Sequence, residues 1–150
     1  MIDMKFTQGD DGVFDIEIEN GVIKREDGFD TALNLSMLTY GRAPASRVVK
    51  PENRRGWLGN TVSPVIGRNI GSLMWLLNQR RLRQATLNEA ISFSREALNW
   101  IVEDGLAQKI EVTGTIIPQT GIQLAITITA LNGETETYYI NLWELTGNAT

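Results

Sequence analysis

The chain has 150 residues, of which 42% are hydrophobic and 21% are charged, and its formal net charge is −4, so one folded domain over residues 1–150 is expected. Cysteine and histidine are absent, which excludes disulfides, thiolate or imidazole zinc centres, cysteine nucleophiles and Ser-His-Asp triads. No apolar run approaches the roughly 20 residues of a membrane span, and the acidic first residues lack the pattern of a secretory signal, so neither feature is expected.

The first 27 residues predict short strands joined by turns. Apolar and acidic residues alternate over residues 14–19, the period-two pattern of a strand with one solvated face. Asn20-Gly21 is a strong hairpin signal, so an N-terminal β-hairpin region is expected. A first helix should follow, with Asp27 as its N-cap and Gly41 at its end.

Residues 42–69 are the least regular part of the sequence. They contain three prolines and three glycines and show no sustained periodicity, although apolar residues are interspersed with the basic ones. A compact domain rarely carries so long an irregular connection without a functional use. Two interpretations stay open, a wrap that stabilises the fold and a basic partner-binding loop, and we favour the second.

Two further helices are predicted after this loop. Apolar residues recur at helical spacing over residues 70–77, just before a segment rich in arginine. Residues 86–89 (Thr-Leu-Asn-Glu) have the form of a capping box, and Gly105 is placed to be the C′ residue of the helix that starts there. The apolar stripe of this helix is wide, which predicts packing on more than one side, including against a sheet.

The last 45 residues predict an antiparallel sheet of about three strands. Residues 110–113 and 122–129 alternate in hydrophobicity, and Asn132-Gly133 fits a two-residue type I′ turn. That turn would pair Ala125 with residue 140 and Ile126 with residue 139. The chain is therefore predicted to be an α+β protein with an N-terminal β-hairpin region, three helices and a C-terminal antiparallel sheet.

The final strand is predicted to be apolar on both faces, since Tyr139 and Trp143 alternate with other apolar residues. Such a strand is either covered on both sides or lies at a sheet edge, where it invites strand addition from a partner.

Charge is segregated along the chain. The net charge is −6 over residues 1–30, +8 over residues 42–95 and −6 over residues 96–150. Either the acidic outer elements neutralise a basic centre, or the centre forms a basic binding surface.

Carboxylate pairs are the best catalytic candidates in this composition. Glu103 and Asp104 could act as acid and base on a glycoside, but adjacent helical residues point about 100° apart, so we interpret them as surface residues. The acidic turn at residues 10–17 lacks the spacing of a calcium-binding EF-hand loop, and residues 67–71 lack a phosphate-binding motif. We predict no catalytic, metal or cofactor site.

Arginine and tryptophan occur together in two segments, residues 54–57 (Arg-Arg-Gly-Trp) and residues 75–83. Cations beside stacking rings are typical of nucleic-acid binding. The acidic total and the absence of a known nucleic-acid-binding module make that use unlikely, and both residue types are also enriched at protein–protein interfaces. We therefore favour a protein partner.

Three tryptophan motifs stand at specific spacing: Arg-Arg-Gly-Trp-x-Gly at residues 54–59, Gly-Ser-x-x-Trp-Leu-Leu at residues 71–77, and Glu-Ala-Leu-x-Trp followed by Glu-Asp-Gly over residues 96–105. With Arg-Ala-Pro at residues 42–44 and Asp-Gly at residues 27–28, this pattern covers about residues 3–145. It resembles the small baseplate proteins of Mu-like phages and prophages. That family is similar to the sheath-initiator wedge proteins of other contractile tails and type VI secretion systems.

The resemblance implies a non-enzymatic structural role, in the virion tail baseplate and in the host cytoplasm during assembly. The implied partners are other baseplate wedge proteins and the tail sheath protein, with several copies per assembly, no cofactor and no membrane. The C-terminal strand would be the one from which the sheath starts to polymerise. The residues expected to bind partners are Arg42, Arg54, Arg55, Trp57, Glu103, Tyr139 and Trp143, whereas Trp75 and Trp100 are expected to belong to the core.

In the related wedge family a Glu-Pro-Arg triplet follows the long helix. The matching stretch here is Glu103-Asp104-Gly105, so the arginine would have to come from elsewhere in the chain, from Arg42 or residues 54–55. Two other functions stay open: a carboxylate-dependent, lysozyme-like glycan hydrolase, testable with Glu103→Gln in a peptidoglycan-release assay, and a basic-patch nucleic-acid binder, testable by the salt dependence of DNA retention.

Overall fold

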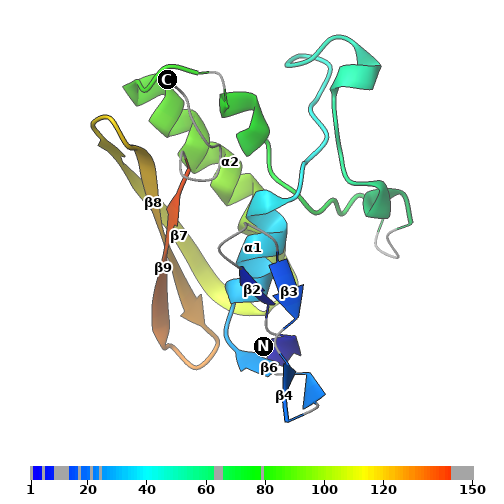
Figure 1. Ribbon diagram of the computed structural model, residues 1–150, viewed down its shortest axis with the longest axis vertical. Coiled ribbons are helices and arrows are strands. Elements are labelled where there is room, and N and C mark those ends of the chain that lie inside the picture. Colours follow the sequence, from blue (N-terminus) through cyan, green and yellow to red (C-terminus); the bar gives the residue numbers. More distant parts are fainter. Residues whose placement is uncertain are drawn as a thin grey trace.

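The computed structural model describes the chain apart from residues 1, 5, 9–13, 17, 21, 24, 63–65, 79 and 143–150. Its main body has two layers (Figure 1). Strands β7 (Ala107–Ile117), β8 (Gly121–Ala130) and β9 (Thr135–Asn141) form an antiparallel sheet in that order. The long helix α2 (Gln84–Glu103) packs against this sheet, and α1 (Asp30–Leu38) contacts α2. The predicted α+β class and three-stranded C-terminal sheet are confirmed.

The core lies between α2 and one face of the sheet. Alternate residues of β8, from Ile122 to Ile128, are almost fully buried and face the helix, while the residues between them are partly exposed. Such alternation is typical of a sheet with one solvated face. Gly114 of β7 lets the helix approach closely, since a Cβ there would lie 2.8 Å from Leu87 Cδ1 and 2.9 Å from Leu124 Cδ2.

The β8–β9 hairpin differs from its predicted form. A type I′ turn needs a positive φ at both central residues, but Asn132 is not among the residues with positive φ, whereas Gly133 has a φ of 89°. The amide of Gly133 bonds to the Ala130 carbonyl at 3.0 Å, and the Ala130 amide bonds to the Glu134 carbonyl at 2.8 Å. The loop therefore has three residues rather than two.

The predicted register of β9 is wrong by one residue as a result. Ala125 pairs with Tyr139 rather than with residue 140, and Ile126 pairs with Tyr138 rather than with residue 139. Because side chains alternate across a strand, this shift exchanges the faces that the prediction assigned. Tyr138 packs against the core and Tyr139 is 68% exposed on the solvated face.

The ends of α2 follow two different signals. The capping box predicted at residues 86–89 is wrong, because the helix begins at Gln84 and the Thr86 hydroxyl donates a hydrogen bond to the Arg81 carbonyl at 2.7 Å. The prediction for Gly105 is confirmed. Its φ is 69°, and the amides of Gly105 and Leu106 bond to carbonyls of the last turn, the Schellman arrangement of a helix C-terminus.

The prediction of three helices is wrong, since α1 and α2 are the α-helices of the described residues and residues 70–77 form only the 3₁₀ helix η3 (Met74–Leu77). The backbone just before η3 pairs with the segment after α1 instead of forming a helix. Gly71 has a φ of 122°, and Ser72 forms an isolated parallel bridge with Tyr40. A helix cannot begin at residues committed to that pairing.

Short antiparallel pairs occupy the first 27 residues. Strand β1 (Ile2–Met4) pairs with β6 (Arg25–Asp27), β2 (Phe6–Gln8) with β3 (Phe14–Ile16), and β4 (Ile18–Glu19) with β5 (Val22–Ile23). The β4–β5 hairpin turns at Asn20, which has a φ of 53°, as predicted. Asp27 lies in β6, so the predicted N-cap of α1 is wrong and Phe29 occupies that position.

Candidate partner-binding site

Residues 42–70, here called the arm, leave the body after α1 and return to it before η3, projecting on one side (Figure 1). The two ends of the arm lie side by side. The Gly41 amide bonds to the Ser72 carbonyl at 2.8 Å, and the Ser72 amide bonds to the Thr39 carbonyl at 2.9 Å. No described residue of the arm belongs to the hydrophobic core cluster. Ala43, at the start of the arm, is buried, but it is separate from that cluster.

The predicted site residues Arg42 and Arg54 hold the arm's own backbone. Arg42 Nη1 donates to the Arg55 carbonyl at 3.2 Å, and Arg54 Nε donates to the Val48 carbonyl at 2.9 Å. The backbone is also closed at this point, because the Ala43 amide bonds to the Arg54 carbonyl at 2.9 Å. These guanidinium groups satisfy carbonyls that the irregular segment, with its short 3₁₀ helices η1 (Pro51–Asn53) and η2 (Leu58–Val62), cannot satisfy by itself.

The Arg55 guanidinium packs on two aromatic rings at the base of the arm. Its guanidinium carbon is 4.6 Å from the ring centre of Tyr40 and 4.8 Å from that of Trp75. The Trp75 indole is itself fixed, since its Nε1 donates to the Gly41 carbonyl at 2.9 Å. Cation–π contacts of this kind contribute about 0.5–1 kcal/mol each at exposed sites. The stack positions the base of the arm.

Two ion pairs attach the arm to α2. Arg47 reaches Glu89 at 2.7 Å, and its guanidinium also lies 5.3 Å from the ring centre of Phe93. Arg68 binds both carboxylate oxygens of Asp104, the C-cap of α2, with Nη1–Oδ2 at 2.6 Å. The arm is thus fixed near both ends of the long helix. Arg68 is absent from the predicted site residues, although the adjacent acids at the end of the helix were a signal that a cation should meet them.

Several large apolar side chains of the arm are exposed, and those of Val49, Leu58, Val62 and Ile66 have exposed fractions from 80% to 101%. We call Leu58, Val62 and Ile66, which lie in η2 or shortly after it, the apolar tip. Together with Val49, they are the most exposed of the large hydrophobic side chains in the described residues. The predicted site residue Trp57 is less exposed, at 48%, and its ring lies against Gly59, where a Cβ would come within 2.3 Å of it.

The remaining predicted site residues lie apart from the arm or outside the description. Glu103 is exposed at the end of α2 and accepts a hydrogen bond from Asn99 Nδ2 at 2.5 Å. Tyr139 is exposed on β9, and Trp143 lies outside the described residues. The expected core tryptophan Trp100 packs against the core and donates to Ser36 Oγ at 2.9 Å.

Strand β9 forms one edge of the sheet. Hydrogen bonds to β8 at both ends of the strand, from the Ala130 amide to the Glu134 carbonyl and from the Leu142 amide to the Ile122 carbonyl, place the even-numbered residues of β9 in hydrogen-bonded pairs. In an antiparallel ladder the residues between them direct their amides and carbonyls the other way. The backbone groups of Thr137 and Tyr139 therefore face the outer edge, where no described strand pairs with them.

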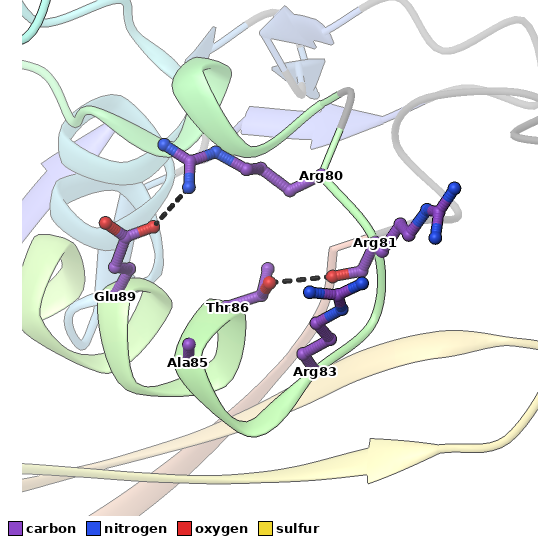
Figure 2. A pocket seen from close by; sticks show the side chains of 6 residues that line it. All are labelled: Arg80, Arg81, Arg83, Ala85, Thr86 and Glu89. Atoms are coloured by element: carbon purple, nitrogen blue, oxygen red, sulfur yellow. Dashed lines mark hydrogen bonds and ion pairs between the residues drawn. The ribbon is translucent and has the colours of Figure 1, made fainter.

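An open pocket of about 370 Å³ lies at the start of α2 (Figure 2). Its charged lining consists of Arg80, Arg81, Arg83 and one carboxylate, Glu89. Glu89 pairs with Arg47 and lies 3.6 Å from Arg80. General acid–base catalysis of glycoside hydrolysis by carboxylates needs two of them, and this pocket has one, which is already paired with arginine. The described residues contain no cluster of three acidic side chains that could hold a metal ion, and none of their helices is long and apolar enough to cross a membrane.

Comparison with known proteins defines the family. Residues 29–135 match the family described as "Phage protein GP46", and the chain belongs to this family. It is 30% identical over 115 residues to "Baseplate protein gp46" of Escherichia phage Mu, an alignment that covers 75% of this chain and 77% of the relative. It is 27% identical over 111 residues to "Mu-like prophage FluMu protein gp46" of Haemophilus influenzae, covering 74% and 75%. The resemblance to the baseplate proteins of Mu-like phages is confirmed.

Proposed function

We propose that this chain is a non-enzymatic structural component of a phage tail baseplate, that it docks on neighbouring wedge proteins through the arm, and that β9 pairs with the tail sheath protein. Its place of work would be the virion tail, after assembly in the host cytoplasm. The baseplate role is supported by the name of the phage Mu relative. Docking and sheath pairing are supported by the geometry of the chain itself.

The observation that carries the docking proposal is the arm. Ordering a backbone costs about 1–2 kcal/mol for each residue, and a segment that lies outside the hydrophobic core cluster recovers little of that cost from the fold. The described residues of the arm are absent from the core cluster, yet many hydrogen bonds, ion pairs and ring contacts hold them in place. Binding to another protein explains why the arm is ordered despite this entropy cost. It explains the arm better than the alternative, a segment that wraps the body to stabilise the fold.

Removal of the arm tests this proposal. Because Gly41 and Ser72 are hydrogen-bonded neighbours, a short Gly-Ser linker can replace residues 43–70 and still close the chain. We expect the shortened protein to keep the circular dichroism and cooperative unfolding of the α2–sheet body but to be absent from purified tails, as measured by quantitative immunoblotting. Tails that contain normal amounts of the shortened protein would contradict docking through the arm.

The predicted arginine site gives a finer test of the same surface. We expect the double variant Arg54→Glu, Arg55→Glu to leave the body folded and to stop incorporation, because it reverses two charges and removes both the Val48 bond and the ring stack. Arg81→Glu with Arg83→Glu, a double charge reversal at two exposed arginines outside the arm, is the matched control and should still be incorporated. Unfolding of the double variant, or normal tails that contain it, would count against the proposal.

The outer edge of β9 supports the sheath contact. A strand added there would bond to the outward amides and carbonyls of Thr137 and Tyr139. Tyr139→Pro removes one outward amide without removing a bond to β8, whereas Tyr139→Ala removes the side chain and keeps the amide. We expect baseplates in both cases, but sheath assembly only with Tyr139→Ala, by electron microscopy. Normal sheaths with Tyr139→Pro would exclude pairing at this edge.

A further inference from the structure

We propose that the apolar tip, rather than the arginines, makes the contact with the partner, and that the tip inserts into an apolar groove with an acidic rim on a different baseplate protein. This inference rests on the proposed docking function and specifies its chemistry. It assigns the arginines of the arm to a second task, which is to hold the tip in a fixed shape before binding.

The exposure of the tip is the first observation. Leu58, Val62 and Ile66 keep at most a fifth of their surface covered in the isolated chain. Single exposed apolar residues are ordinary on protein surfaces, but three within nine consecutive positions indicate an interaction site. The arm also exposes Val49 and, to a lesser extent, Trp57, and the remaining exposed large hydrophobic side chains of the described residues are spread over the N-terminal strands, the α1 segment and the β8–β9 hairpin.

The internal use of the arginines is the second observation. Arg42 and Arg54 donate to carbonyls within the arm, Arg55 contacts two rings, and Arg47 and Arg68 are paired with carboxylates of α2. If one of these guanidinium groups left its internal contact to bind a partner, the free energy of that contact would be lost. A guanidinium group that keeps its internal contact holds the arm in order before binding, which lowers the entropy cost of docking.

The charge of the arm defines the rim of the groove. Six cations and one acid, Glu52, give the arm a net charge of +5. Two of these cations, Arg47 and Arg68, are paired with carboxylates of α2, which leaves a net charge of +3 around the arm, and Lys50 has no ion-pair partner among the described residues. An acidic rim would complement this field and exclude basic surfaces. The pocket of this chain at Arg80, Arg81 and Arg83 is itself basic, so it would repel the arm of a second copy.

Serine substitutions in the tip test the contact. We expect Leu58→Ser with Ile66→Ser to leave the melting temperature unchanged and to lower incorporation into tails at least about tenfold, since burial of even one large aliphatic side chain is worth about that factor. Leu131→Ser, at a side chain that is 61% exposed in the β8–β9 loop, is the control and should assemble normally. Normal incorporation of the tip variant would overturn the inference.

Photocrosslinking identifies the groove. With 4-benzoylphenylalanine in place of Val62, assembled tails should yield, after irradiation, a crosslink to a different baseplate protein, in a peptide that combines apolar residues with Asp or Glu. The same group in place of Lys109, on the solvated face of β7, is the control for random labelling. A crosslink to another copy of this chain, to a basic peptide or to nothing would refute the inference.

These outcomes separate the two proposals. If the wild-type chain is missing from the tails, the baseplate function itself fails. If the chain is present and only the arm deletion prevents its incorporation, while the serine variant is incorporated normally, the arm docks but its apolar tip does not make the contact.

Discussion

The body and the arm of this protein use the same residue types in opposite ways. In the body, apolar side chains such as Leu98 and Leu124 are fully buried between α2 and the sheet. In the arm, large apolar side chains such as Leu58 and Ile66 are exposed, and the arginines contact carbonyls, rings and carboxylates of the same chain. The body is therefore built to be stable alone, and the arm is built to present a surface that becomes buried only in an assembly.

The physical basis of order also differs between the two regions. The body depends on apolar burial, which is non-directional and roughly proportional to area. The arm depends on charged contacts at partly exposed side chains: the Arg68 and Asp104 side chains are 25% and 28% exposed, and the Arg47 side chain is 41% exposed. Such pairs are individually weak and are screened by salt. The arm should therefore loosen with added salt well before the body unfolds.

The comparison is tested most strongly by one substitution made in both regions. Leu98 is fully buried, so Leu98→Ala should reduce the free energy of unfolding by about 2–5 kcal/mol. Leu58 is 81% exposed, so Leu58→Ala should change it by less than about 0.5 kcal/mol. Urea denaturation of the two variants measures both values. A similar loss in the two would remove the distinction between body and arm.

The close approach of α2 to the sheet predicts the next largest effect. Gly114→Ala would place a Cβ 2.8 Å from Leu87 Cδ1 and 2.9 Å from Leu124 Cδ2, so an overpacking cost of about 1–3 kcal/mol is expected. Thr113→Ala, at the exposed neighbouring position, is the control and should change the midpoint little. An unchanged denaturation midpoint for Gly114→Ala would mean that the helix can move away from β7 at no cost.

A smaller effect is expected at the base of the arm. Arg55→Ala removes the cation from the Tyr40 and Trp75 rings, at a local cost of about 1 kcal/mol, whereas Arg55→Lys keeps a cation there. Hydrogen exchange of the Ala43 amide, which bonds to the Arg54 carbonyl, should become about fivefold faster with alanine and change less with lysine. The melting temperature of the body should not move. Equal exchange in all three proteins would show that the stack does not order the arm.

The smallest expected effect concerns alkaline pH in the body. Burial, followed by the hydrogen bond to Glu136, raises the pKa of Tyr138 above its usual value. The folded state thus favours the neutral phenol, and its contribution is fully present below the unfolded pKa of about 10 and is lost as the pH rises above that value. Stability should fall above pH ~10 in the wild type and in Tyr139→Phe, and fall less in Tyr138→Phe. Identical pH profiles of all three in thermal melts would contradict this assignment.

Much of the body could be predicted from the sequence because its signals are local and periodic. The alternation over residues 122–129 and the left-handed position of Gly105 needed no distant contact to be interpreted. The β9 register needed more. Asn132 does not adopt the positive φ of a two-residue turn, so the loop has three residues. This local difference moves every pairing partner of the strand by one residue.

Residues 42–69 form the irregular segment that the sequence predicts, and none of its described residues belongs to the hydrophobic core cluster. Arg42, Arg54 and Arg55 were predicted as contact residues from their type and from the resemblance to baseplate proteins, and the structure gives each of them an internal partner. Arginine is suited to both tasks, because its guanidinium can bind a carbonyl, a carboxylate or a ring in its own chain as well as in another. Composition cannot distinguish these uses.

The sequence by itself determined the residue types, the apolar periodicities that make the long helix and the last strands, and the segregation of charge that makes residues 42–95 basic. The tertiary structure decided which charges became internal contacts and which apolar residues remained exposed. The reason is distance. Helical and strand periodicity act between near neighbours, whereas the pairings of Arg47 with Glu89 and of Arg68 with Asp104 join residues 42 and 36 positions apart and arise only once α2 is in place.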